Sequence, residues 1–244
     1  MANEIRINKY IADSGLCSRR AADKLIESGR VRLNGETLKT PAVKVGTEDE
    51  VLVDGQPVKP VETTVLYRFY KPRGVLCTAK DPQGRPTIFD LLPPGAPRLV
   101  LVGRLDMNSE GLLLLTNDGD LAQKMMQPKT GLERTYRVRA YGKIPPNFLS
   151  RLSKGIKIDG VKYRPIKVEV DKNPDGHNTW FNVTLQEGKN REIRKVFEHF
   201  GLQVSRLIRT GYGPFGLTNL PPKGIVEVPQ HTMKKFLSKL EEVK

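Results

Sequence analysis

The segment GRLDMNSEGLLLLTNDGDL, residues 103–121, follows one short apolar run, Leu99–Val102, and contains a second, Leu112–Leu115. Short apolar runs bounded by glycine predict buried strands, so the residues between them form a loop. Asp106 then lies on that loop, at the edge of a core. A carboxylate in such a place needs a cationic partner or a chemical role.

Strand patterns outnumber helix patterns in the rest of residues 65–240. Strand character is found at residues 65–70, 99–102, 112–116, 135–141, 167–170 and 179–185, and helical character at 120–126, 146–154, 191–200 and 232–242. Several predicted strands follow one another without a helix between them. This order favours an α+β fold with a largely antiparallel sheet over a doubly wound fold. Glu110, Asp118 and Asp120 are placed for turns and helix caps.

Residues 5–53 are predicted to form a small separate domain. Ser18 is placed to cap the second of two short helices, which ends at Gly29. A short strand then runs into Asn34-Gly35, which is a tight hairpin signal. Residues 54–64 are rich in proline and threonine and have no apolar period, so they are predicted to be a linker.

The charge of the chain indicates a polyanionic partner. The net charge is +14 and the isoelectric point is about 9.8. Residues 1–64 carry equal numbers of basic and acidic side chains, so residues 65–244 hold the entire excess. Clustered lysine and arginine gain free energy by releasing counterions from phosphates, which makes a nucleic acid the expected partner.

Composition and motifs also exclude several classes of protein. A mean hydropathy of −0.43 and the lack of an apolar run near the roughly 18 residues of a membrane span argue against a membrane protein. The N-terminal residues do not resemble a secretion signal, so a cytoplasmic protein is expected. Cys17 and Cys77 lie in separate segments without zinc-ligand spacing and are expected to be ordinary thiols.

No metal site, catalytic triad or nucleotide cradle is expected. The three histidines, His177, His199 and His231, are scattered and have no ligand partner at a suitable spacing. Ser109 and Ser205 have no evident basic partner, and no glycine-rich phosphate-binding motif is present. The chemistry is therefore expected to need no cofactor.

The segment EGKNREIRKVF, residues 187–197, predicts a helix that presents basic side chains beside a core. Its apolar stripe has helical spacing and comprises Ile193, Val196, Phe197 and Phe200. Arg191, Arg194 and Lys195 fall on a neighbouring face, which can bind phosphate or hold a carboxylate.

Residues 133–138, ERTYRV, predict an alternating strand. Tyr136 and Val138 point to one face of it, whereas Arg137 and Arg139 point to the other. An aromatic ring at a basic sheet surface is a platform for a nucleobase. Core packing is the alternative interpretation of the tyrosine.

These motifs together resemble a known enzyme family. The segment GRLDMNSEGLLLLTNDGDL is similar to the catalytic motif of the RsuA family of ribosomal pseudouridine synthases, and the segments around Tyr136 and at 187–197 are similar to two further motifs of that family. Residues 7–35, INKYIADSGLCSRRAADKLIESGRVRLNG, resemble an S4 RNA-binding domain. The resemblance implies an S4-like domain at 5–53, a linker at 54–64 and a synthase domain at 65–240, built on a largely antiparallel mixed sheet.

The resemblance implies three catalytic residues. Asp106 is the sole catalytic acid, Arg194 is its ionic partner, and Tyr136 stacks on the target uracil. The carboxylate can act as a nucleophile at the sugar or the base, or as the group that abstracts a sugar proton, and the residues leave these alternatives open.

Further residues are implied to bind the substrate. Ile193 lines the uracil pocket, Lys71 supports the active-site loop, Arg104 contacts or displaces RNA near the flipped nucleotide, and Arg191 belongs to the same basic face. In the S4-like domain, Arg19, Arg20, Lys24 and Arg32 are expected to contact the RNA backbone.

Residues 70–93 and 204–213 look most like the branch of the family whose members modify RNA of the large ribosomal subunit. The implied substrate is one uridine of 23S ribosomal RNA close to the peptidyl-transferase region, modified by a monomeric protein. A 16S RNA synthase, a non-catalytic S4-type assembly factor and a hydrolase remain as alternatives. A non-catalytic assembly factor would give Asp106 no role, and a hydrolase would require a second carboxylate opposite Asp106.

Overall fold

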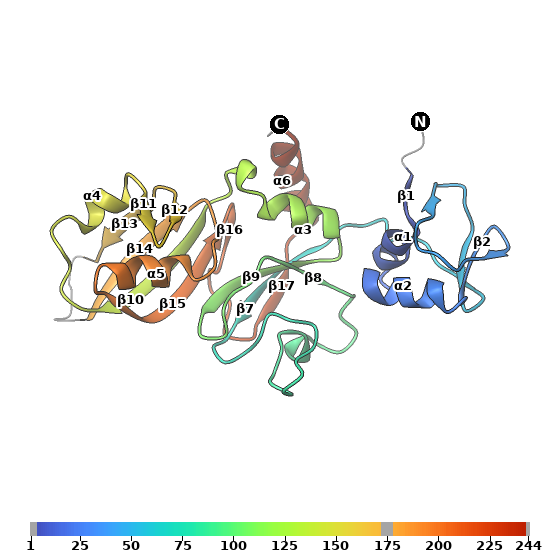
Figure 1. Cartoon of the computed structure of the whole chain (residues 1–244), viewed down its shortest axis with the longest axis horizontal. Helices are drawn as coiled ribbons and strands as arrows, with labels where there is room; N and C mark the ends of the chain where they lie inside the picture. The colour runs from blue at the N-terminus through green and yellow to red at the C-terminus, as the bar shows by residue number, and fades with distance from the viewer. Residues whose placement is uncertain (1–3, 172–177, 243–244) are drawn as a thin grey trace. The chain divides into compact units, whose positions relative to one another are not determined.

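The computed structural model describes residues 4–171 and 178–242, which form two compact units (Figure 1). The first unit comprises Met1–Val65, Pro94–Val100 and Thr116–Leu121. The second comprises Leu66–Pro93, Leu101–Leu115 and Ala122–Lys244. The expectation for His177 lies outside the described residues.

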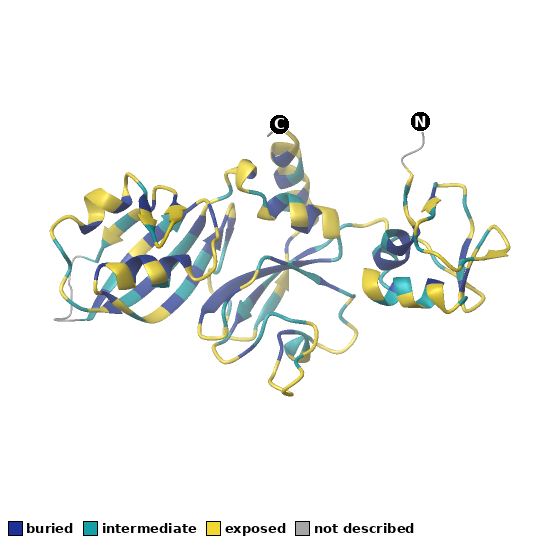
Figure 2. Ribbon diagram, viewed as in Figure 1, coloured by how far each residue is buried: buried dark blue, intermediate teal, exposed yellow. Residues whose placement is uncertain are grey.

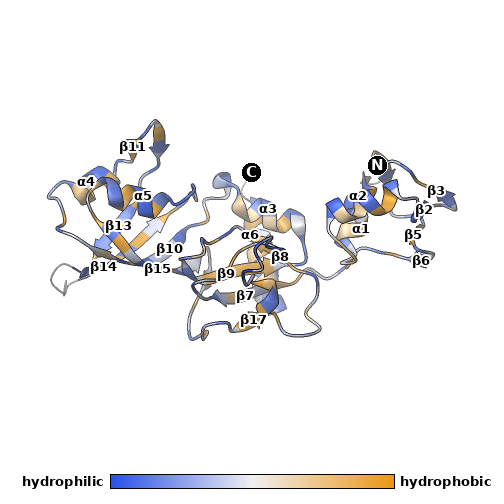
Figure 3. Ribbon diagram, turned by 60° about the horizontal axis from the view of Figure 1, so that its bottom comes forward, coloured by the Kyte–Doolittle hydropathy of each residue, from blue (hydrophilic) through white to orange (hydrophobic). Residues whose placement is uncertain are grey.

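The first unit packs two helices against a small sheet. Its elements are β1 (Ile5–Arg6), α1 (Ile7–Asp13), α2 (Arg19–Glu27), β2 (Val31–Leu33), β3 (Glu36–Thr37), β4 (Lys44–Val45), β5 (Val51–Val53) and β6 (Gln56–Pro57). The Ser18 hydroxyl caps α2 by accepting a hydrogen bond from the Ala21 amide at 3.1 Å, as predicted. Apolar and hydrophilic residues alternate around α2, and its Ala22 and Ile26 enter the core (Figure 3).

The sheet of this unit has the strand order β3-β2-β5-β6. Strand β6 lies inside the segment predicted to be a linker. The reason is the Asp54-Gly55 turn, in which both residues have positive φ, so that the chain folds back onto β5.

The second unit is built on a nine-stranded mixed sheet. Its main path has the order β13-β14-β10-β15-β9-β7-β17, with β16 paired to β15 and β8 paired to β9. The strands are β7 (Leu66–Lys71), β8 (Val100–Val102), β9 (Glu110–Thr116), β10 (Arg134–Tyr141), β13 (Lys167–Val170), β14 (Asn178–Leu185), β15 (Gln203–Tyr212), β16 (Phe215–Gly216) and β17 (Ile225–Glu227). Strand β15 is parallel to β9 and antiparallel to β10, which confirms the predicted largely antiparallel mixed sheet.

The remaining elements are helices, short 3-10 helices and a hairpin. They are η1 (Phe89–Leu91), α3 (Gly119–Met126), η2 (Pro128–Thr130), α4 (Phe148–Leu152), α5 (Glu192–His199) and α6 (Gln230–Glu242), and a separate hairpin joins β11 (Ile156–Ile158) to β12 (Val161–Tyr163). Helix α5 lies over the sheet strands β10 and β15 (Figure 1). Phe148 of α4 packs edge-on against Phe181 and Phe197, with ring centroids 5.9 and 5.2 Å away.

Strand β15 and the hairpin were not predicted. A central strand is usually continuously apolar, whereas β15 contains Arg206 and Arg209. Both arginines have partners that the sequence does not reveal, because Arg206 pairs with Glu110 and Arg209 donates to the Leu112 carbonyl.

Strand β9 is buried along its whole length (Figure 2). Its first residues pair with β15, and this close approach fixes their position. Gly111 has φ of 104°. A Cβ atom at this position would lie 2.3 Å from the carbonyl oxygen of Arg209 on β15, so only glycine fits. The loop that precedes β9 is therefore anchored to the centre of the sheet.

Candidate active site

The loop between β8 and β9, which carries Asp106, is held by hydrogen bonds from a buried lysine. Lys71 ends β7 and its side chain has no exposed surface. Its ammonium group donates hydrogen bonds to the carbonyl oxygens of Ser109 at 2.8 Å, Pro72 at 3.0 Å and Met107 at 3.4 Å. Burial lowers the pKa of Lys71, and the charge of Asp106 opposes this effect. Lys71 thus contacts the loop that it was predicted to support.

Three further hydrogen bonds fix the backbone of this loop. The Gly74 amide donates to the Met107 carbonyl at 2.8 Å, and the Ser109 amide donates to the Asp106 carbonyl at 3.0 Å. The Leu105 amide points to the sulfur of Cys77, one of two free cysteines, at 3.4 Å. The residues on both sides of Asp106 are therefore held by hydrogen bonds.

The carboxylate of Asp106 faces an arginine of the 187–197 segment. The Arg191 guanidinium lies 3.8 Å from Asp106 Oδ2, and the two side chains are 49% and 35% exposed. Asp106 is thus at the edge of the core, as predicted, and not enclosed in an apolar pocket. Arg191 precedes α5 instead of belonging to it, because its φ of 52° is left-handed and the helix begins at Glu192.

The side chain of Arg194 contacts the backbone of the same loop. Its guanidinium donates to the carbonyl oxygens of Val204 and Asn108, both at 3.0 Å. Burial lowers the pKa of Arg194, the charge of Arg191 adds to that effect, and Asp106 opposes it. The structure therefore differs from the predicted ion pair: Arg191 meets the carboxylate, whereas the hydrogen bonds of the Arg194 guanidinium go to backbone carbonyl groups.

Tyr136 and Ile193 lie in one apolar cluster. Tyr136 is half-buried on β10, opposite Val183 of β14 and Arg209 of β15, and it packs against the cluster that contains Ile193. On the other face, Arg137 stacks over Trp180 at 5.0 Å. The predicted alternation of this strand is confirmed.

The remaining predicted residues are exposed. Arg104 lies at the start of the loop, and the four basic residues of the first unit, Arg19, Arg20, Lys24 and Arg32, lie on α2 and β2. All five side chains are exposed to solvent.

Glu110 has a role that the sequence did not reveal. It is buried on β9, where it accepts hydrogen bonds from Arg206 at 2.7 Å and from the Tyr70 hydroxyl at 3.3 Å. Burial acts to raise the pKa of Glu110, but these partners hold it below its ordinary value. Its predicted place in a turn or cap is therefore wrong, whereas Asp118 does cap α3 by accepting from the amide of Leu121 at 2.9 Å.

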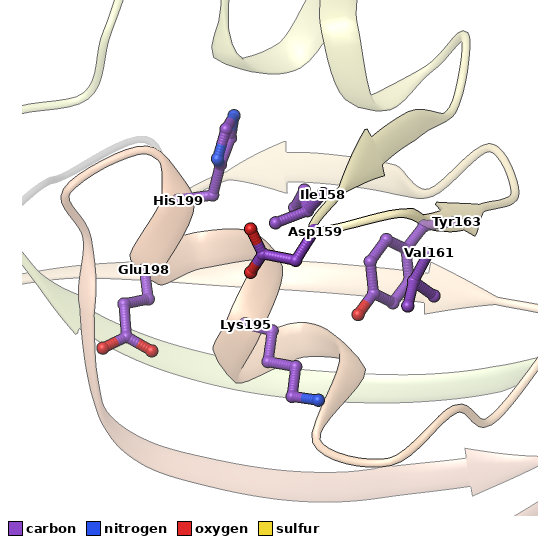
Figure 4. Close-up of a pocket in the computed structure, with 7 residues that line it drawn as sticks. All are labelled: Ile158, Asp159, Val161, Tyr163, Lys195, Glu198 and His199. Carbon is purple, nitrogen blue, oxygen red and sulfur yellow. The ribbon is translucent and has the colours of Figure 1, made fainter.

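A cavity of about 340 Å³ lies between α5 and the hairpin β11–β12 (Figure 4). Ile158, Asp159, Val161 and Tyr163 line it from the hairpin, and Lys195, Glu198 and His199 line it from the helix. It contains none of the predicted site residues. Over residues 4–171 and 178–242, no cluster of three or more His, Cys, Asp or Glu side chains is arranged to bind a metal, and no helix has the length and apolarity of a membrane span.

Comparison with known proteins identifies the family. The model for RNA pseudouridylate synthases matches residues 65–199, and the model for the S4 domain matches residues 5–51. The chain belongs to the RNA pseudouridylate synthase family. It is an RNA pseudouridine synthase with an N-terminal S4 domain, which confirms the expectation of an enzyme over a non-catalytic binding protein.

Full-length relatives and a solved structure agree with this identification. An uncharacterised RNA pseudouridine synthase of Rickettsia typhi is 44% identical over 96% of this chain and 95% of the relative. Ribosomal large subunit pseudouridine synthase B of Yersinia pestis is 42% identical over 90% of this chain and 70% of the relative. A crystal structure described as a pseudouridylate synthase is 29% identical, with a TM-score of 0.67 over 95% of this chain and 99% of that one.

Proposed function

We propose that this synthase converts one uridine of 23S ribosomal RNA, close to the peptidyl-transferase region, to pseudouridine. The names of two similar proteins support a large-subunit substrate, because relatives from Yersinia pestis and Shigella flexneri, 42% and 39% identical, are called ribosomal large subunit pseudouridine synthase B. The basic excess of residues 65–244 is consistent with a structured RNA. The protein would act on this RNA as a monomer in the cytoplasm.

The observation that carries the assignment of the site is the Asp106 carboxylate beside Arg191, on a loop that Lys71 holds by hydrogen bonds. Isomerisation breaks the bond between the sugar and N1 of uracil, turns the base and joins the same sugar carbon to C5. C5 loses a proton and N1 gains one, so the product is an isomer of the substrate, atoms and electrons balance, and no cofactor is required. Asp106 supplies the carboxylate for this step, and Arg191, 3.8 Å away, fixes its direction.

Tyr136 and Ile193 are proposed to receive the target base. A base inside a folded RNA must leave its stack, which costs a few kcal/mol. Stacking of the base on the Tyr136 ring and its burial against Ile193, which lies in the same cluster, recover part of this cost. The exposed Arg104 then fills the space that the base has left.

The S4 domain is proposed to grip the RNA backbone through Arg19, Arg20, Lys24 and Arg32. These contacts are with phosphates, so they add affinity and a salt dependence but do not select a base. Selection of one uridine is left to the synthase domain.

The experiment is to incubate the purified protein, and nothing else, with unmodified 23S and 16S transcripts and with isolated large-subunit precursor particles. Pseudouridines are mapped by primer extension after carbodiimide treatment. We expect one new position in 23S RNA, and none with Asp106→Asn at equal RNA affinity. Modification of 16S RNA alone would overturn the large-subunit substrate, and product from Asp106→Asn would overturn the assigned role of Asp106.

A further inference from the structure

The turn that precedes α5 contains two buried acids and one ammonium group. Glu187 and Glu192 are 6% and 4% exposed. The Lys189 ammonium forms an ion pair with Glu187 and donates to the Lys162 carbonyl at 2.8 Å. A single cation therefore serves a pair of carboxyl groups, and its ion pair is made with Glu187.

Glu192 is bonded on one oxygen only. Its Oε2 accepts a hydrogen bond from the Lys189 amide at 2.9 Å, whereas Oε1 is buried and has no partner. Apart from burial, the interaction of the two carboxyl groups acts to raise the pKa of Glu192 and to lower that of Glu187. A hydrogen bond between the two groups would need a proton, because two carboxylates only accept. The two carboxyl groups can therefore share a hydrogen bond only when Glu192 is a neutral acid.

The balance of the groups that face this pair favours a proton on Glu192 rather than on Glu187. Burial raises the pKa of Glu192 to about 7; the bond from the Lys189 amide opposes burial, and the charge of Glu187 adds to it. Glu187 also accepts from the Arg164 amide at 2.7 Å. Tyr163 of β12 closes the other side, with its ring 5.6 Å from the Lys189 ammonium and its pKa raised, first by burial and then by the charge of Glu192.

This cluster is continuous with the site. Arg191 lies between the turn and α5, and its left-handed backbone is unfavourable for a residue with a side chain. The Glu192 amide donates to the Lys189 carbonyl at 3.2 Å on one side, and the Lys195 amide donates to the Arg191 carbonyl at 2.9 Å on the other. The conformation of Arg191 therefore depends on the closed turn.

We propose that Glu192 is a positioning residue for the isomerisation: as a protonated acid it links Glu187 to the Lys189 amide, and the closed turn holds Arg191 in the conformation that reaches Asp106. The inference rests on the proposed roles of Asp106 and Arg191. Above neutral pH, Glu192 ionises and faces the Glu187 carboxylate, so the turn loosens. Glutamine at position 192 keeps both an acceptor and a donor at every pH.

The test compares single-turnover rates at saturating RNA between pH 5.5 and 9. The proteins are the wild type, Glu192→Gln, Glu192→Ala and the control Glu198→Gln, an exposed acid of the same helix (Figure 4). We expect the ratio of the Glu192→Gln rate to the wild-type rate to rise about tenfold from pH 6 to pH 8.5, which corresponds to about 1.4 kcal/mol. Glu192→Ala should be slow at every pH, and Glu198→Gln should follow the wild type.

The outcomes separate this inference from the function on which it rests. A wild type that makes no pseudouridine refutes the proposed function, and with it the inference. An active wild type whose pH profile is shared by Glu192→Gln refutes the positioning role alone. Tryptophan fluorescence identifies a variant that does not fold, and RNA affinity, which should be unchanged in Glu192→Gln, separates positioning from binding.

Discussion

Replacing Lys71 by methionine should release the loop that carries Asp106. The side chains are similar in length, so the substitution removes the charge and the donors while it preserves much of the buried volume. The carbonyl oxygens of Ser109 and Pro72 lose bonds of 2.8 and 3.0 Å, and that of Met107 loses a longer one of 3.4 Å. No other group replaces the ammonium at this buried position.

The cost can be worked from these bonds. A hydrogen bond to a charged group contributes about 1.5–3 kcal/mol, so the two short ones together contribute about 3–6 kcal/mol. Methionine recovers part of this, because the buried ammonium no longer has to be desolvated. We expect a net loss of about 2–4 kcal/mol in the free energy of unfolding. Displacement of a reacting group by about 1 Å costs about a hundredfold in rate, which is the expected loss at saturating RNA.

Both quantities can be measured in one preparation. Trp180 is the sole tryptophan and lies on β14, so its fluorescence in a urea titration reports the unfolding of the second unit. Lys234→Met, at an exposed position on α6, is the matched control. A Lys71→Met protein with the urea midpoint and the single-turnover rate of that control would refute the reasoning.

Other substitutions test other parts of the structure. Gly111→Ala should lower the free energy of unfolding by about 3 kcal/mol or more, because its Cβ meets the Arg209 carbonyl, and an unchanged urea midpoint would contradict that contact. The pKa of Glu192 is higher in the folded than in the unfolded protein, so the wild type loses stability as pH rises from 4.5 to 7. In urea titrations, Glu192→Gln should be up to about 3 kcal/mol more stable than the wild type at pH 8 and equally stable at pH 4.5. Activity should survive exhaustive EDTA in monovalent salt, and specific rescue by zinc would reveal a metal site.

The sequence predicted those features that depend on local patterns. Helix α2 begins at its Ser18 cap, and the alternation around Tyr136 is that of a strand with one face in the core. The position of Asp106 on a loop at the edge of the core followed from two short apolar runs. Each of these features is determined by residues close together in the chain.

The features that could not be predicted depend on distant partners. Strand β15 tolerates Arg206 and Arg209 in the middle of a sheet only because β9 supplies a carboxylate and a carbonyl for them. Arg191 adopts a left-handed conformation that its own side chain disfavours, and the contacts that stabilise it come from a turn closed by the Lys162–Arg164 segment. No spacing rule within residues 187–197 contains that information.

The parallel pairing of β9 with β15 also has a consequence for the biosynthesis of this protein. Glu110 and Gly111 pair with Ile208 and Arg209, about a hundred residues later in the chain. At a translation rate of about 5–20 residues per second, the Asp106 loop waits about 5–20 seconds for the strand that completes its sheet. Catalytic competence is therefore among the last properties that a growing chain acquires, and shortening the protein from its C-terminal side should remove activity before it disturbs the S4 domain.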